Sequence, residues 1–163
     1  MRIVAISRQE CSELLKRVSI GRLACSLDDQ PYIVPVAFSY EPDCIYIFST
    51  LGQNIKWMRQ DPKVCLQADE IAKRPIWLSV IVTGTYLELH RPHHTAQREH
   101  ALEQLAQYAD WWRNPLAQRR EHTSDLAIEP MFFRIDIKSM SGVRAIPEVE
   151  ERSLKKAETA AST

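Results

Sequence analysis

The residues with the strongest chemical signal lie between Ser49 and Trp57, in the sequence STLGQNIKW. A strand there ends in two hydroxyls and passes through Gly52 into the start of a helix. The first turn of a helix presents unpaired N–H groups and the positive end of its dipole, which together favour a phosphate. Thr50 could add a second hydroxyl, and Lys56 could add a charge. The pattern equally fits an ordinary strand-to-helix turn, so both interpretations stay open here.

Arginines and histidines elsewhere are weaker candidates. Arg22 and Arg134 lie on otherwise apolar strands, where a charge on a solvated sheet face is the simpler interpretation. His90, His93 and His94 form an HxxHH pattern, and clustered imidazoles can bind a metal ion. The histidines fall in a predicted turn and no nearby cysteine completes a ligand set. The sequence therefore predicts a solvated loop and no metal site.

Tandem tryptophans, Trp111 and Trp112, follow a helical segment and fit an interface, a lid or plain core packing. The chain contains no GxSxG, no HExxH, no Walker loop and no Rossmann glycine fingerprint. Hydrolase and kinase chemistry therefore have no support. The pattern favours a protein that binds a cofactor, with the cofactor supplying the reactivity.

Alternation with period two indicates six strands, and apolar residues at helical spacing indicate three helices. The predicted strands are Leu23–Leu27, Tyr32–Tyr40, Ile45–Thr50, Lys63–Ala68, Trp77–Leu89 and Met131–Lys138. The predicted helices are Ser7–Val18, which starts from a capping box, Gly52–Asp61 and Thr95–Asp110. Gly84 predicts a bulge or a close backbone approach inside the fifth strand. Antiparallel strands with few peripheral helices predict a mainly β fold, a small closed or split β-barrel.

Length and composition set the outer limits. The chain has 163 residues, 45% of them hydrophobic, which predicts one domain over residues 1–146 and a polar tail over 147–163. Lys plus Arg and Asp plus Glu number 21 each, so no net charge draws the protein to nucleic acid or an anionic membrane. Four scattered cysteines predict free thiols, and no segment resembles a signal peptide or membrane span. We expect a cytoplasmic protein.

Three stretches together resemble a known family: GRLACSLDDQPYIVPVAFSY, IYIFSTLGQNIKWMRQDPKVCLQAD and WLSVIVTGTYLEL. They are similar to the pyridoxamine 5'-phosphate oxidase-like FMN-binding split-barrel family, especially its small bacterial flavin-nucleotide-binding and nitroimidazole-resistance branch. The similarity extends from about Ser7 to Arg144. It implies a six-stranded antiparallel split β-barrel of the FMN-binding type, and a homodimer with FMN in a groove at the subunit interface.

The resemblance also implies ten cofactor-binding residues and names no catalytic residue. The implied phosphate site consists of Ser49, Thr50, Gly52, Gln53 and Asn54. The implied contacts to the flavin ring come from Val34, Pro35, Val36, Trp77 and Ser79. Relatives usually read GQK in the loop that opens the helix, whereas this chain has Asn54 in place of the lysine.

Two functions from different classes follow from the resemblance. The first is an FMN-dependent oxidoreductase that acts on a small organic substrate. The second is a non-catalytic dimer that binds or stores a flavin, a deazaflavin or haem; an apo structural dimer is a third. Oxidation of pyridoxamine phosphate itself would need a second phosphate site, and the sequence shows no second cluster of basic residues for one.

Overall fold

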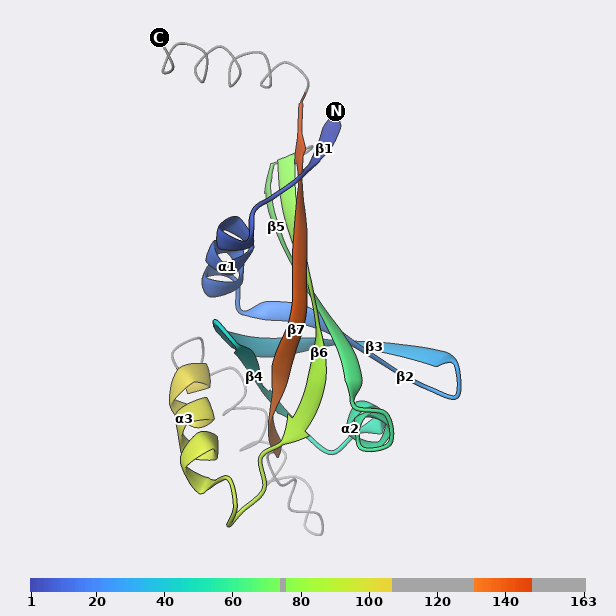
Figure 1. Ribbon diagram of the computed structural model, residues 1–163, viewed down its shortest axis with the longest axis vertical. Helices are drawn as coiled ribbons and strands as arrows, with labels where there is room; N and C mark the ends of the chain where they lie inside the picture. The colour runs from blue at the N-terminus through green and yellow to red at the C-terminus, as the bar shows by residue number, and fades with distance from the viewer. Residues whose placement is uncertain (74–75, 107–130, 148–163) are drawn as a thin grey trace, which may run out of the picture.

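A computed structural model describes residues 1–73, 76–106 and 131–147 (Figure 1). Seven strands and three helices lie within those ranges. The strands are β1 (Arg2–Ala5), β2 (Ile20–Leu27), β3 (Gln30–Glu41), β4 (Cys44–Ser49), β5 (Lys63–Lys73), β6 (Ile76–Glu88) and β7 (Met131–Ile146). The helices are α1 (Arg8–Arg17), α2 (Gln53–Met58) and α3 (Thr95–Ala106). Within the described ranges, no helix combines the length and apolar character that crossing a membrane requires.

The strands form one antiparallel sheet in the order β1-β7-β4-β3-β2-β5-β6. A further pairing between β7 and β6 joins the ends of this order, so six strands close into a ring and β1 extends it. Closure leaves few unpaired edges, which is the physical reason for a barrel. The predicted six-stranded antiparallel split barrel is confirmed.

The β6–β7 ladder requires the glycine at position 84. The register shifts between Thr83 and Gly84, as expected for a bulge. A Cβ at this position would lie 2.5 Å from the carbonyl oxygen of Asp136, far inside van der Waals contact. The predicted close backbone approach is therefore confirmed.

Helix α1 begins at the predicted capping box. The Ser7 side chain accepts a hydrogen bond from the backbone N–H of Glu10, and the Glu10 carboxylate accepts one from the backbone N–H of Ser7 at 2.8 Å. These reciprocal bonds satisfy two of the otherwise unpaired amides. They also hold the pKa of Glu10 below its usual range, with a smaller contribution from Arg144.

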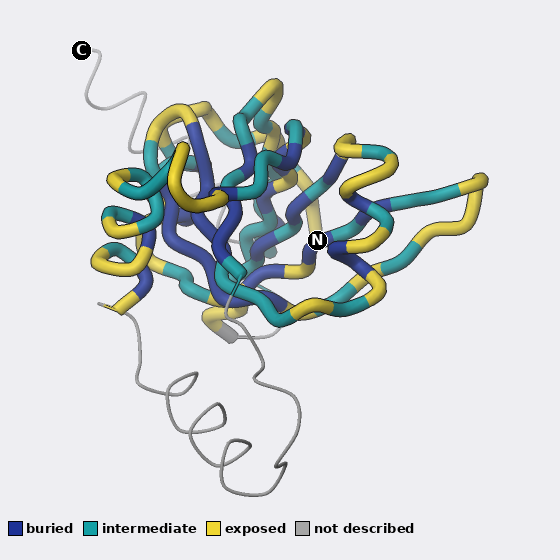
Figure 2. Tube along the Cα trace, turned by 90° about the horizontal axis from the view of Figure 1, so that it is seen from below, coloured by how far each residue is buried: buried dark blue, intermediate teal, exposed yellow. Residues whose placement is uncertain are grey.

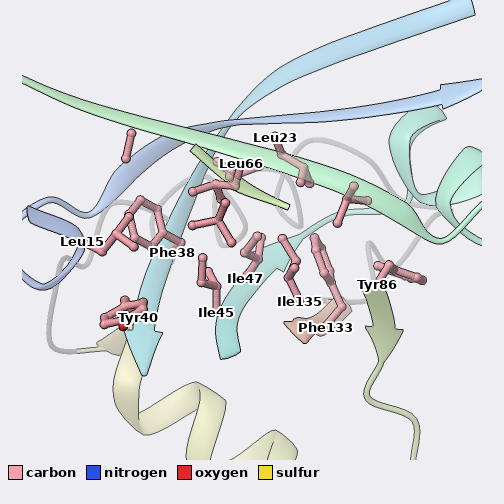
Figure 3. Packing of buried hydrophobic residues seen from close by; sticks show 14 of the residues in the cluster. Leu15, Leu23, Phe38, Tyr40, Ile45, Ile47, Leu66, Tyr86, Phe133 and Ile135 are labelled. Carbon is pink, nitrogen blue, oxygen red and sulfur yellow. The ribbon is translucent and has the colours of Figure 1, made fainter. Parts of the chain in front are cut away.

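The core fills the barrel interior with inward-pointing side chains from β2, β3, β4, β5 and β7 (Figure 3). Ile45, Ile47, Phe133 and Ile135 are fully buried there. A second, smaller apolar cluster, which includes Leu105, lies between α3 and the outer face of β4. Figure 2 shows the buried chain at the centre and exposed positions along the projecting β2–β3 hairpin.

Two features differ from the sequence-based expectation. The sequence pattern did not indicate β1, because a short strand that pairs only with the end of β7 buries little apolar surface. Strand β7 continues to Ile146, whereas the sequence predicted its end at Lys138. The prediction stopped early because Ser139 and Ser141 are exposed and interrupt the apolar alternation. Some predictions lie outside the described residues. They are the end of the third predicted helix at 107–110, the tandem tryptophans at 111–112 and the predicted tail after Pro147.

Candidate functional site

The turn between β4 and α2 holds the residues with the strongest chemical signal. Ser49 donates its hydroxyl hydrogen to the carbonyl oxygen of Thr50 at 3.2 Å. Gly52 is the N-cap of α2 and provides no side-chain cap. The helix spans only six residues, Gln53–Met58, so few peptide units add to its dipole. Both hydroxyl-bearing residues are half-buried, which keeps them within reach of a ligand at the turn.

The residue at the position where the resemblance implies a lysine faces inward. Asn54 is only 7% exposed, and its Oδ1 lies against Gly52. Lys56 is exposed, but it belongs to the last turn of α2, away from the amides of the first turn. Neither residue therefore presents a cation at the N-terminal end of α2.

Of the three implied ring contacts on β3, only Pro35 is exposed. Val36 is buried in the core and Val34 packs against it, so these two can offer only backbone atoms outward. Pro35 is exposed and pairs with Arg22 across β2. A cavity of about 350 Å³ lies here, lined by Ile20, Pro35, Val36 and Ala37.

Trp77 and Ser79 line a second cavity, of about 310 Å³, on the outer face of β5 and β6. The Gln67 side-chain amide donates to Ser79 Oγ and to Asp69 Oδ1, both at 3.0 Å. Arg22 in turn donates to Gln67 Oε1 at 3.1 Å and pairs with Asp69. This series of hydrogen bonds connects the cavity at Trp77 with Arg22, which pairs with the exposed Pro35 on β3.

The implied ring contacts on β6 and the β4–α2 turn lie at opposite ends of the long strands. Trp77 on β6 pairs with Ala145, near the C-terminal end of β7. At the N-terminal end of β7, Phe133 pairs with Glu88 of β6 and Met131 pairs with Ser49 of β4. Trp77 and Glu88 are eleven residues apart, about 36 Å of strand. Figure 1 shows β6 extending over most of the height of the molecule. One chain therefore does not bring both groups into a single pocket.

A third cavity, of about 520 Å³, borders the β4–α2 turn at Leu51 and was not indicated by the sequence. Its charged lining comes from Arg59 after α2, Glu88 at the end of β6, Arg91 in the following loop and Arg98 on α3. These residues belong to four different segments, so no local spacing could have marked them. The sequence did not indicate this cluster of basic residues, because the fold assembles it.

Glu88, the one carboxylate among the described residues that line this third cavity, is held by a two-point ion pair. Arg59 Nε and NH2 each donate to Glu88 at 2.8 Å, and the Tyr86 hydroxyl donates to Glu88 Oε2 at 2.8 Å. The Arg59 bond holds the pKa of Glu88 below its usual range. Burial, and then donation to Glu88, raises the pKa of Tyr86. Glu88 is thus charged at neutral pH and its oxygens already have partners.

The remaining sequence candidates do not form a site. His90 is exposed, with its Nε2 3.6 Å from Glu88. Among the residues that the structure describes, no three histidine, cysteine, aspartate or glutamate side chains gather closely enough to hold a metal ion. Arg134 Nε lies 2.8 Å from Asp136 Oδ1.

The four cysteines are free, as predicted from their spacing. Three are buried, and Cys65 is half-buried. Burial raises the pKa of each of the four thiols. A thiol with a raised pKa is a poor nucleophile at neutral pH.

Comparison with known proteins gives a family match over most of the chain. Residues 7–144 match the family model described as pyridoxamine 5'-phosphate oxidase. An uncharacterized protein of Rhizobium meliloti is 38% identical over 149 residues, which cover 87% of this chain and 95% of that protein.

Solved structures repeat the same architecture. The crystal structure of a FAD-binding protein from Mesorhizobium loti is 37% identical with a TM-score of 0.74, and the match covers 90% of this chain and 99% of that one. A nitroimidazole antibiotic resistance protein from Bacteroides thetaiotaomicron is 17% identical with a TM-score of 0.64, covering 88% of this chain and 87% of that one. The second likeness concerns the fold alone.

Proposed function

The chain belongs to the pyridoxamine 5'-phosphate oxidase family, and from this premise we propose that it binds a flavin nucleotide, FMN, between two copies of itself. The observation that carries the proposal is the similarity to the FAD-binding protein from Mesorhizobium loti, which covers 99% of that chain. At 37% identity, this likeness extends to sequence as well as fold. Because that relative binds FAD, FAD is the second candidate ligand.

The β4–α2 turn is the proposed phosphate site. It would use the hydroxyls of Ser49 and Thr50 and the backbone around Gly52, Gln53 and Asn54. Asn54 is buried, so its role is to shape the turn rather than to supply charge. The hydroxyls and amides point to hydrogen bonding as the main source of phosphate affinity at the turn.

The flavin ring is proposed to lie against β3. Pro35 would face it directly, while Val34 and Val36 contribute backbone groups, since their side chains point to the core. Trp77 and Ser79 are proposed to come from the second copy, because about 36 Å of strand separates Trp77 from the Glu88 end of its own β6, beside the turn.

A homodimer is proposed because the outer face of the barrel carries exposed apolar side chains. Four isoleucines on it are between 45% and 65% exposed: Ile20, Ile33, Ile71 and Ile81. They lie on β2, β3, β5 and β6, on the same outer face as Pro35. Exposed apolar side chains on one sheet face provide surface that a second copy of the chain could bury.

The proposed activity is that of an oxidoreductase acting on a small organic substrate. A bound flavin would supply hydride-transfer chemistry. The residues of this chain would bind the phosphate, orient the ring between two subunits and exclude water from it. A non-catalytic flavin, deazaflavin or haem carrier would use the same pocket without turnover.

An absorbance spectrum of the purified protein tests the proposal. Flavin bands near ~370 and ~450 nm, with FMN or FAD identified after release, are the expected result. Bleaching of the bands by NADH or NADPH would support the enzyme, and bands that resist reduction would support the carrier. A protein that neither carries a flavin nor binds FMN, FAD or riboflavin in titrations would refute the proposed function.

A further inference from the structure

A fourth cavity, of about 520 Å³, lies on the outer face of the barrel, where β2, β5, β6 and β7 are neighbours in the sheet. Its volume is within the usual range for small-molecule sites. Two lysines line it, Lys63 at the start of β5 and Lys138 on β7, so we name it the lysine pocket. It shares no residue with the ten implied flavin contacts, and it lies toward the end of β6 opposite Trp77.

The pleat of the sheet brings polar side chains of the pocket to one face. Cys65 on β5 pairs with Ala24 on β2 and with Thr83 on β6. Lys63, two residues before Cys65, pairs with Thr85. Residues paired across antiparallel strands point to the same face, as do residues two apart on one strand. The two threonine hydroxyls and the Lys63 side chain are therefore donors on the same outer surface.

The β-bulge in the β6–β7 ladder sets a second cation on this face. Ser139 and Ile137 pair with consecutive residues of β6, so Lys138 is the extra residue of the bulge. Ile137 and Met140 pack against the core. Lys138 and Ser139 lie between them and are both exposed, so two consecutive side chains face outward where a regular strand would present one. The Ser139 hydroxyl lies 2.6 Å from the Thr83 hydroxyl, and this bond uses only one of their two hydrogens.

No carboxylate lines the lysine pocket within the described part of the chain. Asp136, which lies opposite Thr85 on β7, contacts Arg134 Nε through Oδ1 at 2.8 Å. Asp61 Oδ1 accepts a hydrogen bond from the backbone N–H of Lys63 at 3.1 Å. Neither lysine ammonium of the pocket makes a hydrogen bond or ion pair with the described residues. The lining therefore carries two positive charges, and both ammoniums are available to an anion.

We propose that the lysine pocket binds the carboxylate of a small organic acid. Two ammoniums and several hydroxyls can converge on one carboxylate, and hydrogen bonds between charged groups are the strong ones. Ala24, Pro31 and Cys65 supply apolar surface for the body of the ligand. This surface favours a monoanion over a phosphate dianion, because charge is costly to bury beside groups that cannot solvate it.

Titration of the isotope-labelled full chain with benzoate, followed by two-dimensional NMR of the backbone amides, tests the site without any flavin. We expect millimolar binding that weakens as salt is raised, since the pocket is open to solvent. The largest changes in chemical shift should occur at Cys65, Thr83 and Lys138. Benzamide has the same ring without the charge and should bind clearly more weakly.

Charge-removing variants test the two lysines. Lys138→Gln should weaken benzoate roughly two- to fivefold, the scale of one exposed ion pair. Lys63→Gln combined with Lys138→Gln should weaken it by about fivefold or more. Lys16→Gln is the matched control, because it removes an exposed lysine from α1, outside the pocket, and should change the affinity less than about twofold.

Three results would overturn the proposal: no saturable shifts with benzoate, as would follow if a second copy covered the pocket; equal affinity for benzamide; or equal losses in Lys138→Gln and Lys16→Gln. Shifts confined to residues 49–54 would place the anion at the β4–α2 turn and would also refute it. Wild-type protein that binds benzoate but no flavin refutes the proposed function and supports the lysine pocket.

Discussion

Two defective variants should restore flavin binding when they share a dimer. Thr50→Ala removes a hydroxyl from the β4–α2 turn of one subunit, and Trp77→Leu removes the ring surface that we assign to the other. If each site takes its turn from one chain and Trp77 from the next, a mixed dimer has one intact site and one doubly altered site. If each site lies within one chain, a mixed dimer has none.

The structure sets the expected size of the effect. Loss of the Thr50 hydroxyl should cost about 1–2 kcal/mol of FMN binding, a factor of roughly five to thirty. Removal of the large aromatic surface of Trp77 should cost at least as much. With equal random pairing, half of the dimers are mixed, so about one site in four should bind with wild-type affinity.

Co-expression of the two variants with different affinity tags, followed by FMN titration of the doubly tagged dimer, measures this stoichiometry. Purified mixed dimers should contain one tight site per two chains. Ser49→Ala paired with Thr50→Ala is the matched control, because both changes fall in the turn and no intact site can form. A doubly tagged Thr50→Ala and Trp77→Leu dimer without a tight site would refute the shared-site reasoning.

Three further predictions concern the dimer, the barrel and the ion pair. Ile33 is 62% exposed, so burial in two symmetric copies should contribute about 2–4 kcal/mol, and Ile33→Asp should shift sedimentation toward monomer. Gly84→Ala places a Cβ 2.5 Å from the Asp136 carbonyl oxygen and should lower the free energy of unfolding in urea by about 1–3 kcal/mol or more. Because Arg59 lowers the folded-state pKa of Glu88, the stability it gives is full above the ordinary carboxyl pKa and is lost as pH falls through the lowered value. The difference in melting temperature between wild type and Glu88→Gln should therefore shrink below about pH 4.5 and stay constant above it.

Local patterns were sufficient for much of the fold. The Ser7 capping box, the alternation through the β2–β3–β4 meander and the bulge at Gly84 each depend on residues close together in sequence or on one backbone constraint. Side-chain direction within a turn was not accessible in this way. Asn54 is two residues after the N-cap of α2, and only the packing against Gly52 shows that it faces inward.

The third cavity, which borders the β4–α2 turn, illustrates what sequence alone could not give. Arg59 lies 29 residues before Glu88, and Arg98 follows ten residues after it, so their meeting depends on how α2, β6 and α3 converge at one end of the barrel. The exposed isoleucines posed the opposite problem. The alternation of side chains with period two predicted the strands correctly. It did not predict that isoleucines would be exposed on the outer face of the sheet.

The first and last strands of the barrel assembly are neighbours. Arg2 pairs with Ile146, and β7 also pairs with β4 and β6, so the final strand completes three ladders at once. Such long-range pairing gives the fold a high contact order, which slows folding. During synthesis, β4 and β6 must wait with open edges until β7 leaves the ribosome, and open edges are the part of a β-protein most prone to aggregate. The yield of folded protein should consequently depend on synthesis rate and temperature more than its final stability would suggest.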